Sequence, residues 1–310
     1  MKASIKFWSA VAIAITLFVC GDLVLSGCMS YFYHQSKYGI FHRQIYSLTE
    51  SKKDMLVLGS SRAAYHYIPS VFKDSLGMTC FNSGSGGMCI YYHYAILSSY
   101  LISGRIPQLV IYDINDFDLT PSSEATFTLE AALDRLAPHY SEYPYIDSLF
   151  TLNGWQEKVK MLSLTYRYNS KLVQLLICNF LPSAEDNGYE AVYGQLPYGT
   201  ELKDISDSPE VDIETGKREF FIKMLKDLRA YNIPTLLVYS PIYQKGHADR
   251  IGEIKDIAQL YGVKILDYSN CEQLMKPEFF KDVMHLNDKG AHLFSKLLIA
   301  KLKCDKDTFW

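Results

Sequence analysis

The chain has 310 residues, of which 48% are hydrophobic and 21% are charged, and its formal net charge is −3. This length suits one large α/β domain, or one domain that carries an insertion. The composition is that of a globular protein with a hydrophobic core, and the charge balance provides no basic surface of the kind that binds nucleic acid.

The first 29 residues have the pattern of a membrane or targeting segment. Lysines precede an uncharged run from Phe7 to Val19, which favours a cytoplasmic N-terminus. The span from Phe7 to Met29 matches the roughly 20 residues that a membrane helix needs. We therefore expect residues 1–29 to anchor the chain in a bacterial membrane as an uncleaved helix. Residues 30–53 are expected to form a stalk, and the globular part to lie outside the cytoplasm.

Two alternatives remain for this segment. The sequence Leu25-Ser26-Gly27-Cys28 resembles a bacterial lipobox, which would make the chain a lipoprotein lipidated at Cys28. Asp22, however, stands where such signals keep apolar residues. Simple cleavage of a signal peptide is the other alternative, and all three place the globular part outside the cytoplasm.

The cysteines beyond this segment are widely scattered. They are Cys80, Cys89, Cys178, Cys271 and Cys304. No two have the close spacing of a zinc site, and an odd number does not indicate a disulfide framework, so we expect buried thiols and no metal.

Short aliphatic runs along the rest of the chain predict buried parallel strands. They cover residues 55–58, 78–81, 109–114, 235–239 and 263–266. Helical patterns lie at residues 91–102, 219–231, 250–261 and 288–302. Strands that alternate with helices indicate a doubly wound α/β fold with a parallel sheet, over residues 54–310.

One segment interrupts this alternation. Residues 120–217 separate the third and fourth strands, which is too long for a simple crossover. This stretch contains helical patches and a loop-like tract. We expect it to be a largely helical insertion that packs over the carboxyl edge of the sheet.

Polar residues at the end of the first strand are candidates for chemistry. Ser60 and Ser61 follow this strand directly, and ligands of open α/β sheets bind beyond the carboxyl ends of the strands. A serine at this position exposes its hydroxyl and leaves its own N–H free for an oxyanion. The alternative is that either serine only caps the next helix.

A second candidate pair lies near the C-terminus. Asp282 precedes His285 by three residues, just before the last helix. A serine hydroxyl needs an adjacent imidazole to accept its proton. The imidazole in turn needs a carboxylate to fix its tautomer and stabilise its cation.

At four places, in order, the chain resembles the SGNH (GDSL-like) hydrolase family. The matching motifs are Gly59-Ser60-Ser61, Asn82 to Gly87, Asp113 to Asp116, and Asp282 to His285. Two departures are that Ser60 replaces an aspartate in the first motif and Asp113 replaces a glycine in the third.

The resemblance implies a flavodoxin-like, five-stranded fold and a role for each matching residue. Ser61 would be the nucleophile, His285 the general base and Asp282 the group that orients it. The N–H groups of Ser61 and Gly87, with the amide of Asn115, would bind the oxyanion. Apart from the resemblance, Arg62 follows the nucleophile position and is a candidate for binding an anionic group of the substrate; its alternative role is a salt bridge at the sheet edge.

The expected function is that of an extracytoplasmic serine esterase that needs no cofactor. Its substrate would be an O-acyl group, O-acetyl foremost, on a cell-envelope or secreted polysaccharide. This substrate class is implied by similarity to the branch of the family that acts in bacterial envelope and exopolysaccharide acylation. An O-acyltransferase on the same substrates is one alternative. A non-catalytic envelope scaffold or glycan-binding protein is the other.

Overall fold

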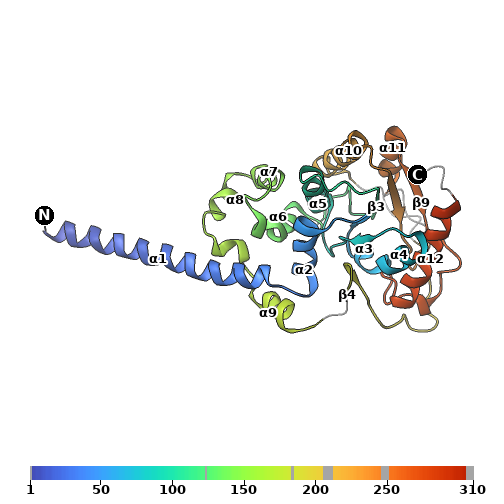
Figure 1. Cartoon of the computed structure of the whole chain (residues 1–310), viewed down its shortest axis with the longest axis horizontal. Helices are drawn as coiled ribbons and strands as arrows, with labels where there is room; N and C mark the ends of the chain where they lie inside the picture. The colour runs from blue at the N-terminus through green and yellow to red at the C-terminus, as the bar shows by residue number, and fades with distance from the viewer. Residues whose placement is uncertain (1, 123, 183–184, 205–211, 246–250, 305–310) are drawn as a thin grey trace. The chain divides into compact units, whose positions relative to one another are not determined.

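The computed structural model describes residues 2–122, 124–182, 185–204, 212–245 and 251–304 (Figure 1). It divides into two compact units. Unit 1 comprises Met1–His42 and Leu133–Ser183, and unit 2 comprises Arg43–Ala132 and Ala184–Trp310.

Unit 2 is built on a five-stranded parallel sheet with the strand order β2-β1-β3-β7-β9. The strands are β1 (Met55–Gly59), β2 (Cys80–Asn82), β3 (Leu109–Asp113), β7 (Thr235–Tyr239) and β9 (Lys264–Asp267). Every neighbouring pair is parallel. This order is that of a flavodoxin-like, doubly wound sheet, so the predicted fold class is confirmed.

Helices form two groups on this sheet. One group is α3 (Ser61–His66), α4 (Pro69–Leu76) and α12 (Asp288–Cys304), in which α12 contacts both others. The second group is α5 (Ile90–Ile102), α10 (Thr215–Ala230) and α11 (Gly252–Tyr261), in which α10 contacts both others.

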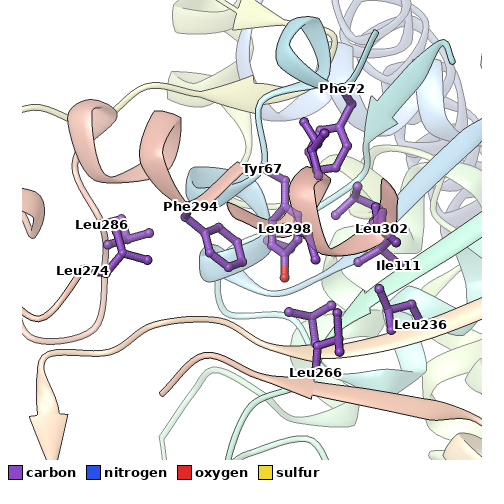
Figure 2. Close-up of a cluster of buried hydrophobic side chains, with 14 of the residues drawn as sticks. Tyr67, Phe72, Ile111, Leu236, Leu266, Leu274, Leu286, Phe294, Leu298 and Leu302 are labelled. Atoms are coloured by element: carbon purple, nitrogen blue, oxygen red, sulfur yellow. The ribbon is translucent and has the colours of Figure 1, made fainter. Parts of the chain in front are cut away.

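The core under α12 is made by alternate residues of the strands, because successive side chains of a strand point to opposite faces. Figure 2 shows Ile111, Leu236 and Leu266 from three strands against Phe294 and Leu298 of α12. Ile111, Leu236, Phe294 and Leu298 are fully buried. On the opposite face, Tyr112 of β3 contacts Phe221 of α10 with ring centroids 5.9 Å apart.

Smaller elements complete unit 2. They are the π-helix η1 (Tyr46–Glu50), the antiparallel pair β4 (Glu185–Asp186) and β5 (Tyr189–Glu190), the parallel pair β6 (Lys203–Asp204) and β8 (Gln244–Lys245), and the 3₁₀ turn η5 (Pro277–Phe279).

Unit 1 is helical among the residues that the structure describes. It contains α1 (Lys2–His34), the 3₁₀ turn η2 (Ala137–His139), α7 (Pro144–Leu152), α8 (Trp155–Lys160), the 3₁₀ turn η3 (Thr165–Tyr168) and α9 (Leu172–Phe180). Two further helices, α2 (Gly39–Ile45) and α6 (Leu129–Leu136), cross the boundaries between the units. A largely helical insertion after β3 is therefore confirmed. Its exact limits and its packing over the sheet edge stay predictions.

A small core of unit 1 surrounds Tyr33. Its hydroxyl lies 2.8 Å from Nε2 of His139, and its ring contacts those of Phe41 and Tyr168. Residues 30–53, expected as a stalk, thus contain the last turns of α1, the helix α2 and the π-helix η1.

One helix in the described part of the chain, Ser4–His34 within α1, is long and apolar enough to cross a membrane. Its mean hydropathy reaches 2.1, and only 6% of its most apolar window is buried. A signal sequence near the N-terminus would have the same properties.

Candidate active site

The turn after β1 places Ser61 at the first position of α3. Gly59 ends the strand with φ of +139°, a conformation that favours glycine. A Cβ atom at this position would lie 2.8 Å from the carbonyl oxygen of Asp113 on the neighbouring strand. The close approach of the two strand ends therefore requires a glycine just before the two serines.

Ser61, His285 and Asp282 form a hydrogen-bonded chain. The Oγ atom of Ser61 lies 2.8 Å from Nε2 of His285. On the other side of the ring, Nδ1 lies 2.9 Å from Oδ1 and 3.1 Å from Oδ2 of Asp282. A carboxylate at Nδ1 holds the proton there, so that Nε2 can accept the serine proton. The structure thus brings together three predicted residues from opposite ends of unit 2.

The carboxylate of Asp282 is itself held by the backbone. Its Oδ1 atom accepts hydrogen bonds from the N–H groups of Met284 at 2.9 Å and His285 at 3.0 Å. Partial burial works to raise the pKa of Asp282, but these bonds and the His285 ring outweigh it and lower the pKa below its ordinary value. Asp282 is therefore ionised at neutral pH, as the orienting role requires.

A second histidine supports the loop that carries His285. His66, fully buried at the end of α3, accepts a hydrogen bond at Nε2 from the N–H of Leu286 at 2.9 Å. Because Nε2 is an acceptor, Nδ1 carries the proton and donates it to Oγ of Ser240 at 3.0 Å. Burial, with the nearby Arg62 and His285, lowers the pKa of His66 well below its ordinary value, so the ring is neutral.

Ser61 and His285 line a pocket of about 290 Å³, together with Gly87 and Asn115. It is lined by Ser60, Ser61, Arg62, Gly87, Asn115, Phe117, Thr126, Phe127, Met284 and His285. A larger pocket of about 820 Å³ lies at the starts of β7 and β9, between α10 and α11, and its lining contains no serine, cysteine, histidine or carboxylate.

The glycine loop after β2 packs closely against α3. A Cβ atom on Gly84 would lie 2.3 Å from the backbone nitrogen of Ala64, so no larger residue fits there. Gly86 comes within 3.6 Å of the Cβ of Ser61 by the same measure. Gly87 has φ of +73°, and its carbonyl accepts a hydrogen bond from the N–H of Phe127 at 2.7 Å.

Asn115 is held by the buried carboxylate of Asp118. The amide Nδ2 donates to Oδ1 of Asp118 at 3.1 Å and approaches Oγ of Ser60 at 3.4 Å. The backbone N–H of Asn115 donates to Oδ2 of the same carboxylate at 2.8 Å. Burial raises the pKa of Asp118 to about 7, although the hydrogen bonds from Asn115 and Tyr112 oppose this shift.

Arg62 makes its contacts with the protein and is only 2% exposed. Its guanidinium donates to the carbonyls of Ile114 and Ser240, which follow β3 and β7. It also lies 3.7 Å from Asp113 and over the ring of Tyr239, 4.5 Å from the centroid. The salt bridge considered as its alternative role is present, whereas a contact with substrate stays a prediction.

Several pocket residues were not anticipated from the sequence. Phe117 and Phe127 stack with ring centroids 4.8 Å apart and an interplanar angle of 24°. The two phenylalanines lie in a loop without periodicity, so no sequence signal marked them as neighbours.

No metal site is evident in the described ranges, because no group of three His, Cys, Asp or Glu side chains there could hold an ion. What the site does contain is a serine, a histidine and a carboxylate at the carboxyl edge of a doubly wound sheet.

Comparisons with known proteins give distant similarities. No protein-family model and no curated protein matches the chain. Among solved structures, it is similar to a proposed acylhydrolase from Bacteroides fragilis NCTC 9343, with 14% identity, a TM-score of 0.39, and coverage of 83% of this chain and 95% of that one. A proposed platelet activating factor from Streptococcus pneumonia gives 13% identity, a TM-score of 0.37 and coverage of 94% and 99%. An acetyl xylan esterase gives 14% identity, a TM-score of 0.39 and coverage of 80% and 99%. At these identities and TM-scores the likenesses carry no argument about activity, so the chemistry must be argued from the geometry of the site.

Proposed function

We propose that the chain is a serine esterase whose nucleophile is Ser61. One observation carries this proposal: Oγ of Ser61, the ring of His285 and the carboxylate of Asp282 are hydrogen-bonded in series at 2.8 and 2.9 Å. This series opens on a pocket large enough for a small acyl group. A helix-capping serine would need neither the imidazole nor the pocket.

The reaction proceeds through an acyl-enzyme. Oγ of Ser61 bonds to the acyl carbonyl carbon while Nε2 of His285 accepts the hydroxyl proton. The oxyanion of the tetrahedral intermediate is bound by the N–H groups of Ser61 and Gly87 and by the amide of Asn115. When the ester C–O bond breaks, His285 gives its proton to the leaving alcohol. Water then attacks acyl-Ser61 while His285 accepts its proton. The bond between the acyl carbon and Oγ breaks, His285 returns the proton to Oγ, and the free acid leaves.

The substrate we propose is an O-acyl group, O-acetyl foremost, on a cell-envelope or secreted polysaccharide. The pocket volume of about 290 Å³ fits a short acyl chain better than a long one. The stacked rings of Phe117 and Phe127 offer this group or its sugar an apolar wall.

We further propose that α1 is retained as a membrane anchor, with the globular part outside the cytoplasm. The hydrogen bonds of Asp22 support retention. Its carboxylate accepts from Oγ of Ser163 at 2.6 Å and from the backbone N–H groups of Leu164 and Thr165. Cleavage before Cys28, whether or not the cysteine is lipidated, would remove Asp22 and leave these donors without it.

The nucleophile is tested by labelling the full chain in detergent with a fluorophosphonate probe. Wild-type protein and the Ser60→Ala variant should be labelled, and Ser61→Ala should not. Ser60→Ala is the matched control because Ser60 is the neighbouring pocket serine, whereas the hydroxyl that lies 2.8 Å from Nε2 of His285 is that of Ser61. Labelling of folded Ser61→Ala at the wild-type rate would refute the assignment.

The substrate class is tested by incubating the labelling-competent enzyme with acetylated polysaccharide and measuring free acetate. Release by wild-type and not by Ser61→Ala is expected. Acetyl transfer to an added glycan without free acetate would instead assign the enzyme as an acyltransferase.

A further inference from the structure

Unit 1 exposes many large apolar side chains between residues 152 and 181. Leu162 is 79% exposed, and Trp155 and Val173 are each 69% exposed. We call these residues together the outer apolar surface; they are Leu152, Trp155, Val159, Leu162, Leu172, Val173, Leu176, Ile177, Phe180 and Leu181. Ten such residues within thirty positions exceed the single exposed apolar residues that are normal for a soluble surface.

The helix α9 illustrates why water is an unsuitable surrounding for this surface. Leu175 and Cys178 of α9 are buried, while Leu172, Val173 and Leu176 are exposed. The helix is therefore apolar on its outward as well as its inward side. A helix that is apolar all round belongs in a protein interior or among lipids.

Hydrogen bonds fix this segment beside the second half of α1. At one end, Asp22 of α1 accepts from Ser163, Leu164 and Thr165. At the other end, Nδ2 of Asn179 donates to the carbonyl of Phe32 at 2.8 Å. Figure 1 shows α9 beside the last turns of α1, and the two helices are in contact. The segment from Ser163 to Asn179 is thus bonded to α1 at residues 22 and 32, which are about 15 Å apart along its axis.

The length of α1 sets the level of this surface relative to a bilayer. A hydrocarbon layer of about 30 Å is crossed by about 20 residues. If the layer begins near Phe7, the first residue after the flanking lysines, it ends near Ser26. Residues 22–32 then lie at the boundary between hydrocarbon and headgroups. The bonds from residues 163–165 satisfy the carboxylate of Asp22 at that depth, where a bare charge would be costly.

The residues around the surface are those of a membrane interface. Trp155 begins α8, and Tyr166 lies in η3. Lys158 and Lys160 are exposed on α8 with Trp155. Tryptophan and tyrosine gather at the headgroup level, and lysine heads reach outward from it.

We propose that the outer apolar surface is embedded in the membrane leaflet around the C-terminal half of α1, so that lipid acyl chains cover it. The chain is then bound to the bilayer both by the spanning helix α1 and by the outer apolar surface. The lipid surface is favoured over a second copy of the chain because lipid that surrounds α1 at residues 22–32 also meets the segment bonded to it there. The inference requires that α1 is inserted, and it is independent of the esterase chemistry.

Tryptophan fluorescence in vesicles tests this inference on the full chain. The sequence has three tryptophans, Trp8, Trp155 and Trp310, the last outside the described residues. The variant Trp8→Phe/Trp310→Phe leaves Trp155 alone. It is reconstituted into phosphatidylcholine vesicles with plain or brominated acyl chains. We expect brominated chains to quench Trp155 emission and aqueous acrylamide to quench it little.

Two control variants make each result decisive. Trp155→Phe/Trp310→Phe leaves Trp8, which reports insertion of α1. Adding Leu260→Trp to the variant that lacks all three tryptophans places one on α11 of unit 2, where Leu260 is 76% exposed, and this one should respond to acrylamide only. Quenching of both Trp8 and Trp155 by brominated lipid supports the inference. Quenching of Trp155 by acrylamide alone would overturn the inference, because water would then surround this residue. Quenching by neither agent would also overturn it, because protein would then cover the surface. Failure of Trp8 to respond to brominated lipid would overturn its premise.

Discussion

Arg62 and Asp113 form a buried ion pair, with the guanidinium 3.7 Å from the carboxylate. Arg62 directly follows the candidate nucleophile, and Asp113 is the last residue of the central strand β3. Each side chain is at most 2% exposed. Burial opposes the charge of Arg62, but the carboxylates of Asp113 and Asp116 outweigh this and raise its pKa further. Asp113 is paired in register with Gly59, so the pair joins α3 to the strand ends that form the base of the pocket.

Removing one partner of this pair should destabilise the fold. Arg62→Met leaves the carboxylate of Asp113 buried without its cation, and we expect a loss of about 3–5 kcal/mol in the free energy of unfolding. The double variant Arg62→Met/Asp113→Leu removes both charges and should recover most of this loss. Urea unfolding of the two variants measures the difference. A single variant as stable as wild type would show that the pair does not hold the site together.

Asp282 should be required for turnover and not for folding. Asp282→Asn keeps the shape of the side chain but no longer favours the His285 tautomer that accepts the serine proton, so kcat should fall about 10³–10⁴-fold. Because the pKa of Asp282 is lowered, the wild-type carboxylate stays ionised until the pH falls below the ordinary value of 3.8. Asp74→Asn, at an exposed position of α4, is the matched control and should keep full activity. Equal kcat in both variants would remove Asp282 from the mechanism.

Asn115 should contribute to kcat more than to KM, because an oxyanion donor acts in the transition state. Asn115→Ala should lower kcat about 10²–10³-fold with an ester substrate. Asn270→Ala, at an exposed position, is the control variant and should leave kcat unchanged. If Asn115→Ala changes KM alone, the amide binds substrate and the oxyanion is held by the backbone N–H groups.

His66 should position the His285 loop without touching substrate. His66→Phe removes the acceptor of the buried Leu286 N–H, which should cost about 1–3 kcal/mol of unfolding free energy and lower kcat with it. His66→Gln keeps an acceptor and should restore part of both. His292→Phe, at an exposed position of α12, should change neither. A loss of stability without any loss of kcat would assign His66 to packing alone.

The sequence predicts the sheet well because five short aliphatic runs alternate with helical patterns. It places the second strand two residues early. The side chain of Asp54 binds both the N–H and the hydroxyl of Thr79, so pairing with β1 starts at Cys80. Ser61, Asp282 and His285 were predictable because their chemistry is recognisable at strand and helix ends. Phe117 and Phe127 were not, since their approach depends on loop contacts such as that of Phe127 with Gly87.

Two buried histidines that are neutral in the folded chain should each lower its stability in mild acid. Burial lowers the pKa of His93 to about 3, and that of His66 also lies well below 6.5. Between these folded values and the unfolded value near 6.5, the unfolded state binds more protons, so the unfolding free energy falls as the pH falls. Each histidine contributes at most about 1.4 kcal/mol per pH unit in that window.

Unfolding in urea between about pH 4.5 and 7 measures this slope. Asp118, whose pKa burial raises to about 7, contributes with the opposite sign in this window, so the histidine share is obtained by comparing variants. His93→Gln has no titrating ring, and its amide can still donate to the carbonyl of Met88, which Nε2 of His93 contacts at 3.3 Å. The pH dependence of the unfolding free energy should therefore lack the contribution of His93 in this variant, even if the variant is less stable than the wild type at every pH. Equal slopes for the wild type and His93→Gln would mean that His93 is protonated as readily in the folded chain as in the unfolded one.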